Sequence, residues 1–345
     1  MFSKLFRSTT KPTIRKARLA CESLEERRVY AINVDPTFID FNLTATVEHT
    51  VQEPGVSQGL DQIRVDGSDL DDTVNILSFN AQTGTAKIQL QVRNNGVLVS
   101  DQTVTLQSNH LYVQHQIAIF GKRGNDTVIN NTGAAIYADG GSGDDYLSGG
   151  SAGDSLNGSD GRDTIMGRKG FDYLEGDGGA DYIRGGDGGD FIYGNDGDDI
   201  LYGEGGNDFV YGGADNDLMF GDAEDVLQGG NDLMDGGAGN DTMWGSGGSD
   251  NMYGGDGNDW MDGGSGRDGM YGNLGSDSLY GGRGADYLDG GTDDPDFSGD
   301  LLEGGRGADT FVHHHHVFGN DDADVFTDFD PSHGDKEDDQ YHSPF

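Results

Sequence analysis

A nine-residue repeat of glycine and aspartate is the feature that most constrains how this chain can fold. Nine consecutive units run from Gly140 to Phe220, and six more run from Gly236 to Asp289. Each unit begins with Gly, carries Asp at its sixth position and has a large apolar residue at its eighth. One apolar residue in nine cannot form the apolar face of an α-helix. The repeat therefore predicts short strands that alternate with six-residue turns.

Stacking these units buries the apolar residues. In a three-residue strand the central side chain faces inward, and the glycine-rich turn before it supplies the positive φ angles that a tight turn needs. Two units then make one flat coil with a strand on each side. Stacked coils form two parallel sheets that face each other across a thin core, which is a solenoid whose units contact mainly their neighbours.

The sixth-position Asp residues have a predicted role in this solenoid. Units on the same side stack about 4.8 Å apart, which is one strand spacing. Bare carboxylates at that distance repel, whereas a hard divalent cation between them is bound by carboxylate and carbonyl oxygens, as Ca²⁺ prefers. The candidate metal ligands, including the one in a final unit at Gly304–Val312, are Asp145, Asp154, Asp163, Asp172, Asp181, Asp190, Asp199, Asp208, Asp217, Asp241, Asp250, Asp259, Asp268, Asp277, Asp286 and Asp309.

The units match G-G-x-G-x-D-x-U-x, and over Gly121–Val312 the chain resembles the RTX, or haemolysin-type, calcium-binding repeat family. The resemblance implies an all-β fold, a right-handed parallel β-roll preceded by a β-rich N-terminal region. It also implies several Ca²⁺ ions between successive same-side turns. Each ion would be held by turn carbonyls and by a pair of Asp residues, such as Asp145 with Asp163 or Asp241 with Asp259.

The sequence predicts four regions. Residues 1–31 are a basic leader or export segment, and within it residues 19–31, apart from Cys21, resemble the Leu-Glu-x-Leu-Glu-x-Arg leader of bacterial surface and exported proteins. Residues 32–120 alternate apolar and polar residues as half-buried strands do, either as a separate domain or as the start of the solenoid. Residues 121–312 are the β-roll, and residues 313–345 form an acidic tail or partial cap.

Two interruptions of the repeat carry their own predictions. Residues 221–235 are interpreted as two shortened units, so a distorted coil with weak or absent ion sites is expected there. In that coil Asp225 and Asp232 would stand out of register with Asp217 and Asp241. Residues 290–303 are interpreted as one unit with an insertion.

Composition excludes several classes of function. Asp and Glu number 62 against 21 Lys and Arg, which gives a formal net charge of −41. A nucleic-acid partner is therefore not expected, because such proteins need a basic surface. No apolar run of about 18 residues is present, so no transmembrane segment is predicted. Cys21 is the single cysteine, so bound ions rather than disulfides would stabilise an extracellular array.

Other motifs do not indicate catalysis. Gly149–Gly153 fits G-x-S-x-G, but the sequence places no triad partner beside it, and no H-E-x-x-H motif occurs. We therefore predict no catalytic residue and expect no enzymatic activity. Residues His313–His316 would alternate between the two faces of a strand, so at most two could share an ion, and surface exposure is the favoured interpretation. Aromatic residues at ninth positions either pack on the sheet or stack on sugars, and packing is favoured.

Together these features predict an exported calcium-binding repeat protein that folds on calcium outside the cell. The expected role is structural or adhesive, at the bacterial cell surface or in the extracellular space, with calcium and a surface or matrix polysaccharide as partners. Two alternatives remain. One is an accessory module of a polysaccharide-active enzyme of the alginate epimerase type, and the other is a different RTX-type secreted effector.

Overall fold

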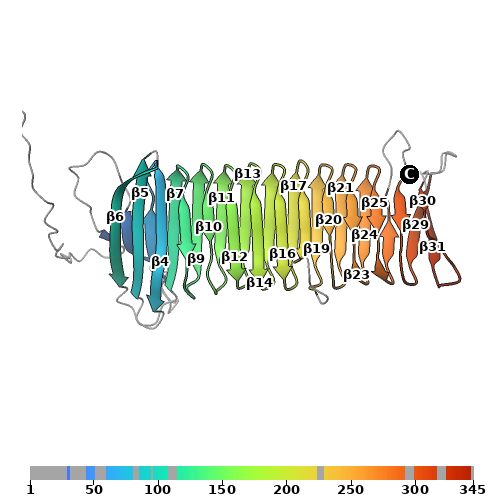
Figure 1. Ribbon diagram of the computed structural model, residues 1–345, viewed down its shortest axis with the longest axis horizontal. Helices are drawn as coiled ribbons and strands as arrows, with labels where there is room; N and C mark the ends of the chain where they lie inside the picture. The colour runs from blue at the N-terminus through green and yellow to red at the C-terminus, as the bar shows by residue number, and fades with distance from the viewer. Residues whose placement is uncertain are drawn as a thin grey trace, which may run out of the picture.

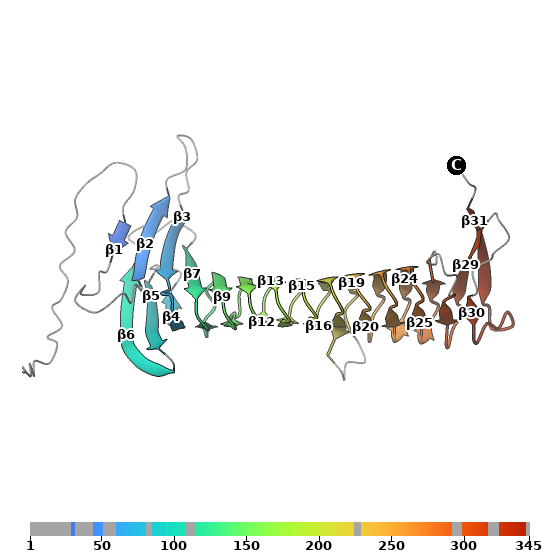
Figure 2. The same ribbon diagram turned by 90° about the horizontal axis from the view of Figure 1, so that it is seen from above.

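The chain folds into a long rod built from two facing β-sheets (Figures 1 and 2). The computed structural model describes residues 29–31, 44–50, 60–80, 85–94, 96–107, 115–223, 229–291, 299–316 and 324–342. Throughout these ranges the regular elements are strands. The described part of the chain contains no helix with the length and apolarity needed to cross a membrane.

Most strands belong to two large sheets, named sheet A and sheet B. In spatial order, the described strands of sheet A are β1 (Val29–Ala31), β2 (Thr44–Thr50), β3 (Leu60–Asp66), β7 (His115–Arg123), β9 (Ile136–Ser142), β11 (Ser155–Asp160), β13 (Tyr173–Gly178), β15 (Phe191–Asp196), β17 (Phe209–Ala214), β19 (Leu233–Ala238), β21 (Asn251–Asp256), β24 (Gly269–Leu274), β27 (Tyr287–Asp289), β29 (Thr310–His316) and β31 (Lys336–His342).

Sheet B runs alongside. Its described strands, in spatial order, are β6 (Val97–Gln107), β5 (Thr85–Asn94), β4 (Asp71–Asn80), β8 (Thr127–Asn130), β10 (Tyr146–Ser148), β12 (Thr164–Lys169), β14 (Tyr182–Asp187), β16 (Ile200–Gly205), β18 (Leu218–Asp222), β20 (Thr242–Trp244), β22 (Trp260–Asp262), β25 (Ser278–Tyr280), β28 (Leu301–Glu303) and β30 (Val325–Phe326). A short pair, β23 (Ser265–Gly266) and β26 (Arg283–Gly284), lies in the turns.

Successive repeat units alternate between the two sheets, and units on the same side pair in parallel. Leu147 in β10 stands opposite Ile165 in β12, and Leu156 in β11 stands opposite Leu174 in β13. Each coil therefore uses two nine-residue units, as the repeat predicts. The predicted fold class, an all-β parallel solenoid, is confirmed.

The eighth-position residues form one continuous core between the sheets. They are 0 to 2% exposed from Leu147 to Phe311. The run of methionines at Met234, Met243, Met252, Met261 and Met270 lies in this core, where the flexible thioether fills a narrow interior well. The core is one residue wide on each side, so the turns must contribute much of the stability of each coil.

The β-rich N-terminal region merges with the solenoid. Strand β3 pairs in parallel with β7, and β4 pairs in parallel with β8, so β3 and β4 form the first coil. Beyond this coil the pairing becomes antiparallel, through β1 and β2 in sheet A and β5 and β6 in sheet B. Figure 2 shows these antiparallel strands at the N-terminal end of the rod. Residues 1–28, which include the leader motif up to Arg28, lie outside the described residues.

The expected loss of register at 221–235 is wrong. This segment is one unit with six extra residues, not two shortened units, and β18 and β19 keep their parallel partners on both sides. The carboxylate of Asp222 joins the two ends of the insertion, because its Oδ1 accepts a hydrogen bond from the N–H of Gly230 (2.9 Å). Its Oδ2 accepts one from the N–H of Gly247 (3.3 Å), in the next same-side coil. The described strands on both sides of the insertion stay in register, so the array continues without a break. Asp225 lies outside the described residues.

The interruption at 290–303 also preserves the coil. Its last three residues form β28, which pairs in parallel with β25, so this segment is one unit with an insertion, as predicted. After it, β29 pairs with β31 and β28 pairs with β30. Phe326 and Phe329 close the end of the core against Phe311, with ring centroids 5.2 and 5.7 Å away. The tail therefore adds strands to both sheets.

Candidate metal centre

The sixth-position Asp residues form two straight ladders, one along each edge of the rod where the chain turns. The first ladder precedes the strands of sheet B and consists of Asp72, Asp126, Asp145, Asp163, Asp181, Asp199, Asp217, Asp241, Asp259, Asp277, Asp300 and Asp324. The second precedes the strands of sheet A and consists of Asp154, Asp172, Asp190, Asp208, Asp232, Asp250, Asp268, Asp286, Asp309 and Asp335.

One hydrogen bond repeats along both ladders. The backbone N–H of each Asp donates to Oδ1 of the Asp in the next coil, as from Asp241 to Asp259 (2.8 Å) and from Asp259 to Asp277 (2.8 Å). Each rung thus joins a turn to the carboxylate stacked on it. The pairs expected to share an ion, Asp145 with Asp163 and Asp241 with Asp259, are neighbours in the first ladder.

The second oxygen of most ladder carboxylates has no hydrogen-bond partner, although it is buried. Asp259 is 2% exposed, and its Oδ2 is one of these atoms. Among the described residues, the ladder carboxylates with an unpartnered Oδ2 include Asp126, Asp145, Asp163, Asp172, Asp181, Asp190, Asp199, Asp208, Asp217, Asp232, Asp241, Asp250, Asp259, Asp268, Asp277 and Asp286. A buried carboxylate oxygen without a partner is costly, so its regular repetition indicates a missing cationic or protic partner.

The first glycine of each unit explains where these oxygens point. A Cβ on Gly254 would collide with Oδ2 of Asp259 and would lie 2.6 Å from the carbonyl oxygen of Gly272, in the next coil. The carboxylate oxygen and the carbonyl oxygen therefore converge beside a Cα that must be bare. The fourth glycine has a different reason, since Gly257 has φ of 140°, which an L-residue rarely adopts. The first glycine of a unit is thus required for space, and the fourth is required for the backbone conformation of the turn.

Burial is the main cause of the raised pKa values of the ladder carboxylates. It raises the pKa of Asp259 from its ordinary 3.8 to about 7, against the opposing effect of the hydrogen bond from the Asp241 N–H. The carboxylates of Asp277 and Asp241 raise this pKa further. The same cause raises the pKa of Asp217 and Asp268 to about 8. A ladder of ionised carboxylates in this setting repels itself, so the fold favours protons or cations at these positions.

The donor set matches a hard cation. Among the side chains that the structure describes, no three His, Cys, Asp or Glu residues converge, so a metal here takes most of its ligands from the backbone. Each recess offers a carboxylate oxygen from one coil and a carbonyl oxygen from the next. All-oxygen sites with several backbone carbonyls suit Ca²⁺, whereas Zn²⁺ prefers nitrogen and sulfur. The residues present therefore fit calcium.

All sixteen predicted ligands lie in the two ladders, but Asp154 and Asp309 are not in the set with an unpartnered Oδ2. The case of Asp154 has a direct cause. Its Oδ2 accepts a hydrogen bond from the N–H of Gly150 (2.6 Å), and its Oδ1 accepts one from Ile136 (2.8 Å). This carboxylate therefore has partners within the protein on both oxygens. Asp154 is the first member of the second ladder, so its Oδ1 accepts a hydrogen bond from Ile136 and not from an Asp of an earlier same-side turn.

Sequence reasoning missed several ladder members. Asp72 and Asp126 follow a glycine by five positions and precede an apolar residue by two, as in the repeat units. Their spacing departs from 18 residues, because Asp72 lies 54 residues before Asp126, and Asp126 lies 19 residues before Asp145. Asp232 and Asp300 lie after insertions, which hide the spacing to the first glycine. The signal that remains there is the Asp followed two residues later by Met234 or Leu302, both fully buried.

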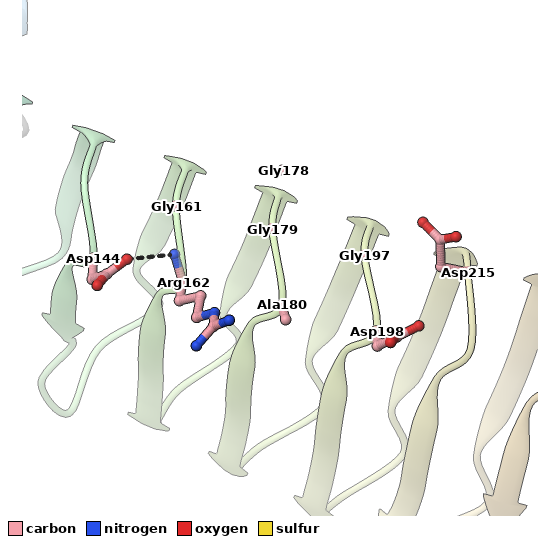
Figure 3. Close-up of a pocket in the computed structure, with 9 residues that line it drawn as sticks. All are labelled: Asp144, Gly161, Arg162, Gly178, Gly179, Ala180, Gly197, Asp198 and Asp215. Carbon is pink, nitrogen blue, oxygen red and sulfur yellow. Dashed lines mark hydrogen bonds between the residues drawn. The ribbon is translucent and has the colours of Figure 1, made fainter.

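A second row of side chains runs outside the first ladder, at the fifth positions. Asp144, Arg162, Ala180 and Asp198 line an open groove there, as Figure 3 shows. The Arg162 N–H donates to Oδ1 of Asp144 (3.1 Å). Farther along the row the same contact recurs between asparagines, for example from the N–H of Asn258 to Oδ1 of Asn240 (2.8 Å). In this row the donor lies in the later coil and the acceptor in the earlier one, which is the reverse of the Asp ladder.

Comparison with known families agrees with this geometry. Residues 139–295 match the family model described as the RTX calcium-binding nonapeptide repeat, in overlapping copies at 139–174, 157–192, 175–210, 193–225, 226–261, 235–270 and 262–295. Within 221–235 one matched copy ends at residue 225 and the next begins at residue 226. No curated protein gives a significant match to the chain.

Proposed function

Because residues 139–295 are an array of RTX calcium-binding nonapeptide repeats, we propose that this chain is an exported protein that folds around calcium outside the cell. In the folded state it serves as a rigid structural or adhesive rod. Each ion would be held between two same-side turns by the Oδ2 of a ladder Asp, such as Asp259, and by turn carbonyls, such as that of Gly272.

One observation carries this proposal, namely the regular series of buried carboxylate oxygens without partners. Buried charge without compensation opposes folding, and here it recurs in nearly every coil. The core offers little to offset this, because each unit contributes one apolar side chain. Calcium would supply both the missing charge and the missing ligation, so its binding free energy becomes folding free energy.

Folding outside the cell follows from the same coupling. Calcium sites of extracellular modules bind with dissociation constants of about 10⁻⁴ to 10⁻³ M. Such sites stay empty in a cytosol with little free calcium, and the chain would remain unfolded there. The formal net charge of −41 keeps that unfolded state expanded and soluble. Filling the sites after export would then drive folding.

Two experiments test the proposal. A calcium titration of the purified chain, followed by circular dichroism, should show a cooperative gain of β-sheet signal in the millimolar range. The same spectrum in chelator and in calcium would contradict folding on calcium. Fractionation of the producing cells should place the protein in the medium or at the surface, and retention in the cytosol would contradict export.

A polysaccharide partner has support from exposed aromatic rings in strand β13 of sheet A and in the turn before it. Phe171 and Tyr173 are 62% and 42% exposed, and aromatic faces can stack on sugars. Farther along the row the rings stack on one another. Phe191 and Phe209 have centroids 4.7 Å apart and planes 8° apart, and Phe209 is 43% exposed. Stacked rings present edges rather than faces, so a sugar would bind at the free ends of the rows. Loss of polymer binding in a Phe171→Ala variant, but not in Phe191→Ala, would support this role.

A further inference from the structure

The row of fifth-position residues outside the first ladder is interrupted at one place. Along most of this row, the backbone N–H of each residue donates to a side-chain oxygen of the fifth-position residue one coil earlier. The donors with such an acceptor are Asn125, Asp144, Arg162, Asn216, Asn240, Asn258 and Ser276. The N–H groups of Ala180 and Asp198 have no acceptor in the described part of the chain, because Arg162 and Ala180 supply no side-chain oxygen to them.

Both interrupted steps lie in the open groove of Figure 3. The methyl group of Ala180 leaves open the space that an Asn or Asp side chain fills elsewhere in the row. The Arg162 side chain extends toward Ala180, whereas the Asp198 carboxylate points away from it (Figure 3). The Arg162 guanidinium has no ion-pair partner among the described residues. A guanidinium and two backbone N–H groups therefore border the same space.

The intact part of the row shows which chemical group fits this space. At three other steps the acceptor is a carboxylate, because Asp71, Asp144 and Asp198 accept the N–H of the next coil at 3.2, 3.1 and 3.0 Å. The backbone and side-chain amides of Asn216 hold the pKa of Asp198 below its ordinary value. The N–H donors of this row therefore favour an ionised carboxylate, and a guanidinium pairs well with the same group.

We propose that this groove binds the carboxylate group of a ligand, which takes the place of the missing side-chain oxygen. The carboxylate accepts hydrogen bonds from the Asp198 N–H and from the Arg162 guanidinium. A single negative charge is favoured, because the carboxylates of Asp144, Asp198 and Asp215 also line the groove and would repel a more highly charged group.

Two sources can supply such a carboxylate, namely a small organic anion and a uronate unit of a polysaccharide. The second source would give the groove a part in binding the proposed polysaccharide partner, and it rests on that proposed function. The carboxylate site itself does not depend on it. The two sources differ in whether the sugar ring adds to the affinity, so they can be distinguished with small ligands.

The chain offers two informative substitutions and a matched control. Ala180→Asn supplies the missing acceptor, because its side-chain oxygen would accept the Asp198 N–H as the side chain of Asn216 accepts the next N–H in the row. This variant should stay folded and lose carboxylate binding. Arg162→Ala removes the charged donor. Arg267→Ala is the control, because Arg267 has a fifth position on the other edge of the rod, and its Nε already donates to the carbonyl oxygen of Ala285 (3.4 Å).

The test is a titration of the calcium-saturated full chain with sodium acetate, followed by nuclear magnetic resonance of the backbone amides. Sodium chloride at equal ionic strength is the blank. The amide signals of Ala180 and Asp198 should shift and saturate, whereas those of Asn240 and Asn258, which already have acceptors, should not. Arg162→Ala should weaken binding about 10-fold, as loss of one hydrogen bond to a charged group does. Arg267→Ala should keep its affinity within about twofold.

Glucuronate and glucose complete the test. Glucuronate should bind at least about 10-fold more tightly than acetate if the ligand is a uronate, and equally if it is a small anion. Neutral glucose should shift neither amide. Absence of a saturable shift at Ala180 and Asp198 with both carboxylates overturns the proposal, and so does equal loss of affinity in Arg162→Ala and Arg267→Ala. Circular dichroism of the same samples reports folding, so a folded chain without carboxylate binding contradicts this site and leaves folding on calcium standing.

Discussion

Replacing Asp259 with Asn should change stability in opposite directions with and without calcium. The substitution keeps the shape of the side chain, and Oδ1 can still accept the hydrogen bond from the Asp241 N–H. It replaces the unpartnered Oδ2 with an amide NH₂, which can donate to the nearby carbonyl oxygen of Gly272. The variant therefore removes a buried charge and a candidate calcium ligand in one step.

The structure gives a magnitude for each direction. Burial raises the pKa of Asp259 from 3.8 to about 7, so at a pH of about 8 the ionised side chain costs the apo fold about 4 kcal/mol. Asn should recover up to that amount in chelator. With free calcium at about 100 times the dissociation constant, one lost site costs about 2.7 kcal/mol. The variant should therefore melt at a higher temperature than the unmodified chain in chelator and at a lower temperature in calcium.

Because the chain is expected to be largely unfolded without calcium, the assay is thermal unfolding in a stabilising osmolyte that populates the apo fold. Unfolding is followed by circular dichroism, in chelator and in calcium, at a fixed slightly alkaline pH. Asp262→Asn is the matched control, because it makes the same chemical change in the same unit at an outward ninth position. It should shift the melting temperature much less in calcium than Asp259→Asn. Destabilisation by Asp259→Asn of equal size in both conditions would refute the idea that this carboxylate is held by calcium.

Three further predictions use the same ladders. In chelator the chain should gain β-sheet signal on acidification, because a carboxyl with a raised folded-state pKa stabilises the fold fully below about pH 4 and loses that effect as the pH rises through about 6 to 8. A β-sheet signal in chelator that rises with pH would contradict this. Gly254→Ala places a methyl group between Asp259 Oδ2 and the Gly272 carbonyl, so it should weaken calcium binding and lower the melting temperature, whereas Gly178→Ala, whose nearest contact would be 3.7 Å away, should do neither. Asp232→Asn should lower the melting temperature in calcium about as much as Asp259→Asn, and a neutral effect would indicate that the ladder is interrupted at the insertion.

The nine-residue phase of the fold could be predicted from the sequence because two independent signals agree in every unit. The Asp at the sixth position and the apolar residue at the eighth fix which residue faces the core, and Leu147 opposite Ile165 is the pairing that this phase requires. A shift by one residue would turn every core side chain outward. The alternation between two sheets then follows from the unit length.

The insertion at 221–235 could not be placed by the same reasoning. Counting residues treats the segment as two short units, whereas in the structure β18 and β19 keep the register of a single unit. The deciding contact is the Asp222 carboxylate, which binds the N–H groups of Gly230 and Gly247 on the far side of the insertion. Such a contact depends on tertiary position, so spacing alone does not reveal it.

The candidate site was predictable in its residues but not in its geometry. The repeat indicates that Asp241 and Asp259 are neighbours, but it does not show that one oxygen of each carboxylate is taken by the preceding N–H group. It also does not show that the first glycine is required for space rather than for a positive φ angle. These features arise from the stacking of one coil on the next.

The most direct test of the account is an anomalous difference map from crystals of the calcium-loaded protein. The account predicts a row of ion peaks along each edge of the rod, each peak beside the Oδ2 of a ladder Asp such as Asp259 and the carbonyl oxygen of the stacked first glycine, here Gly272. The rows should continue past Asp232 without a gap. Crystals grown in saturating calcium that show no peaks along the ladders would contradict the claim that calcium compensates the buried carboxylates.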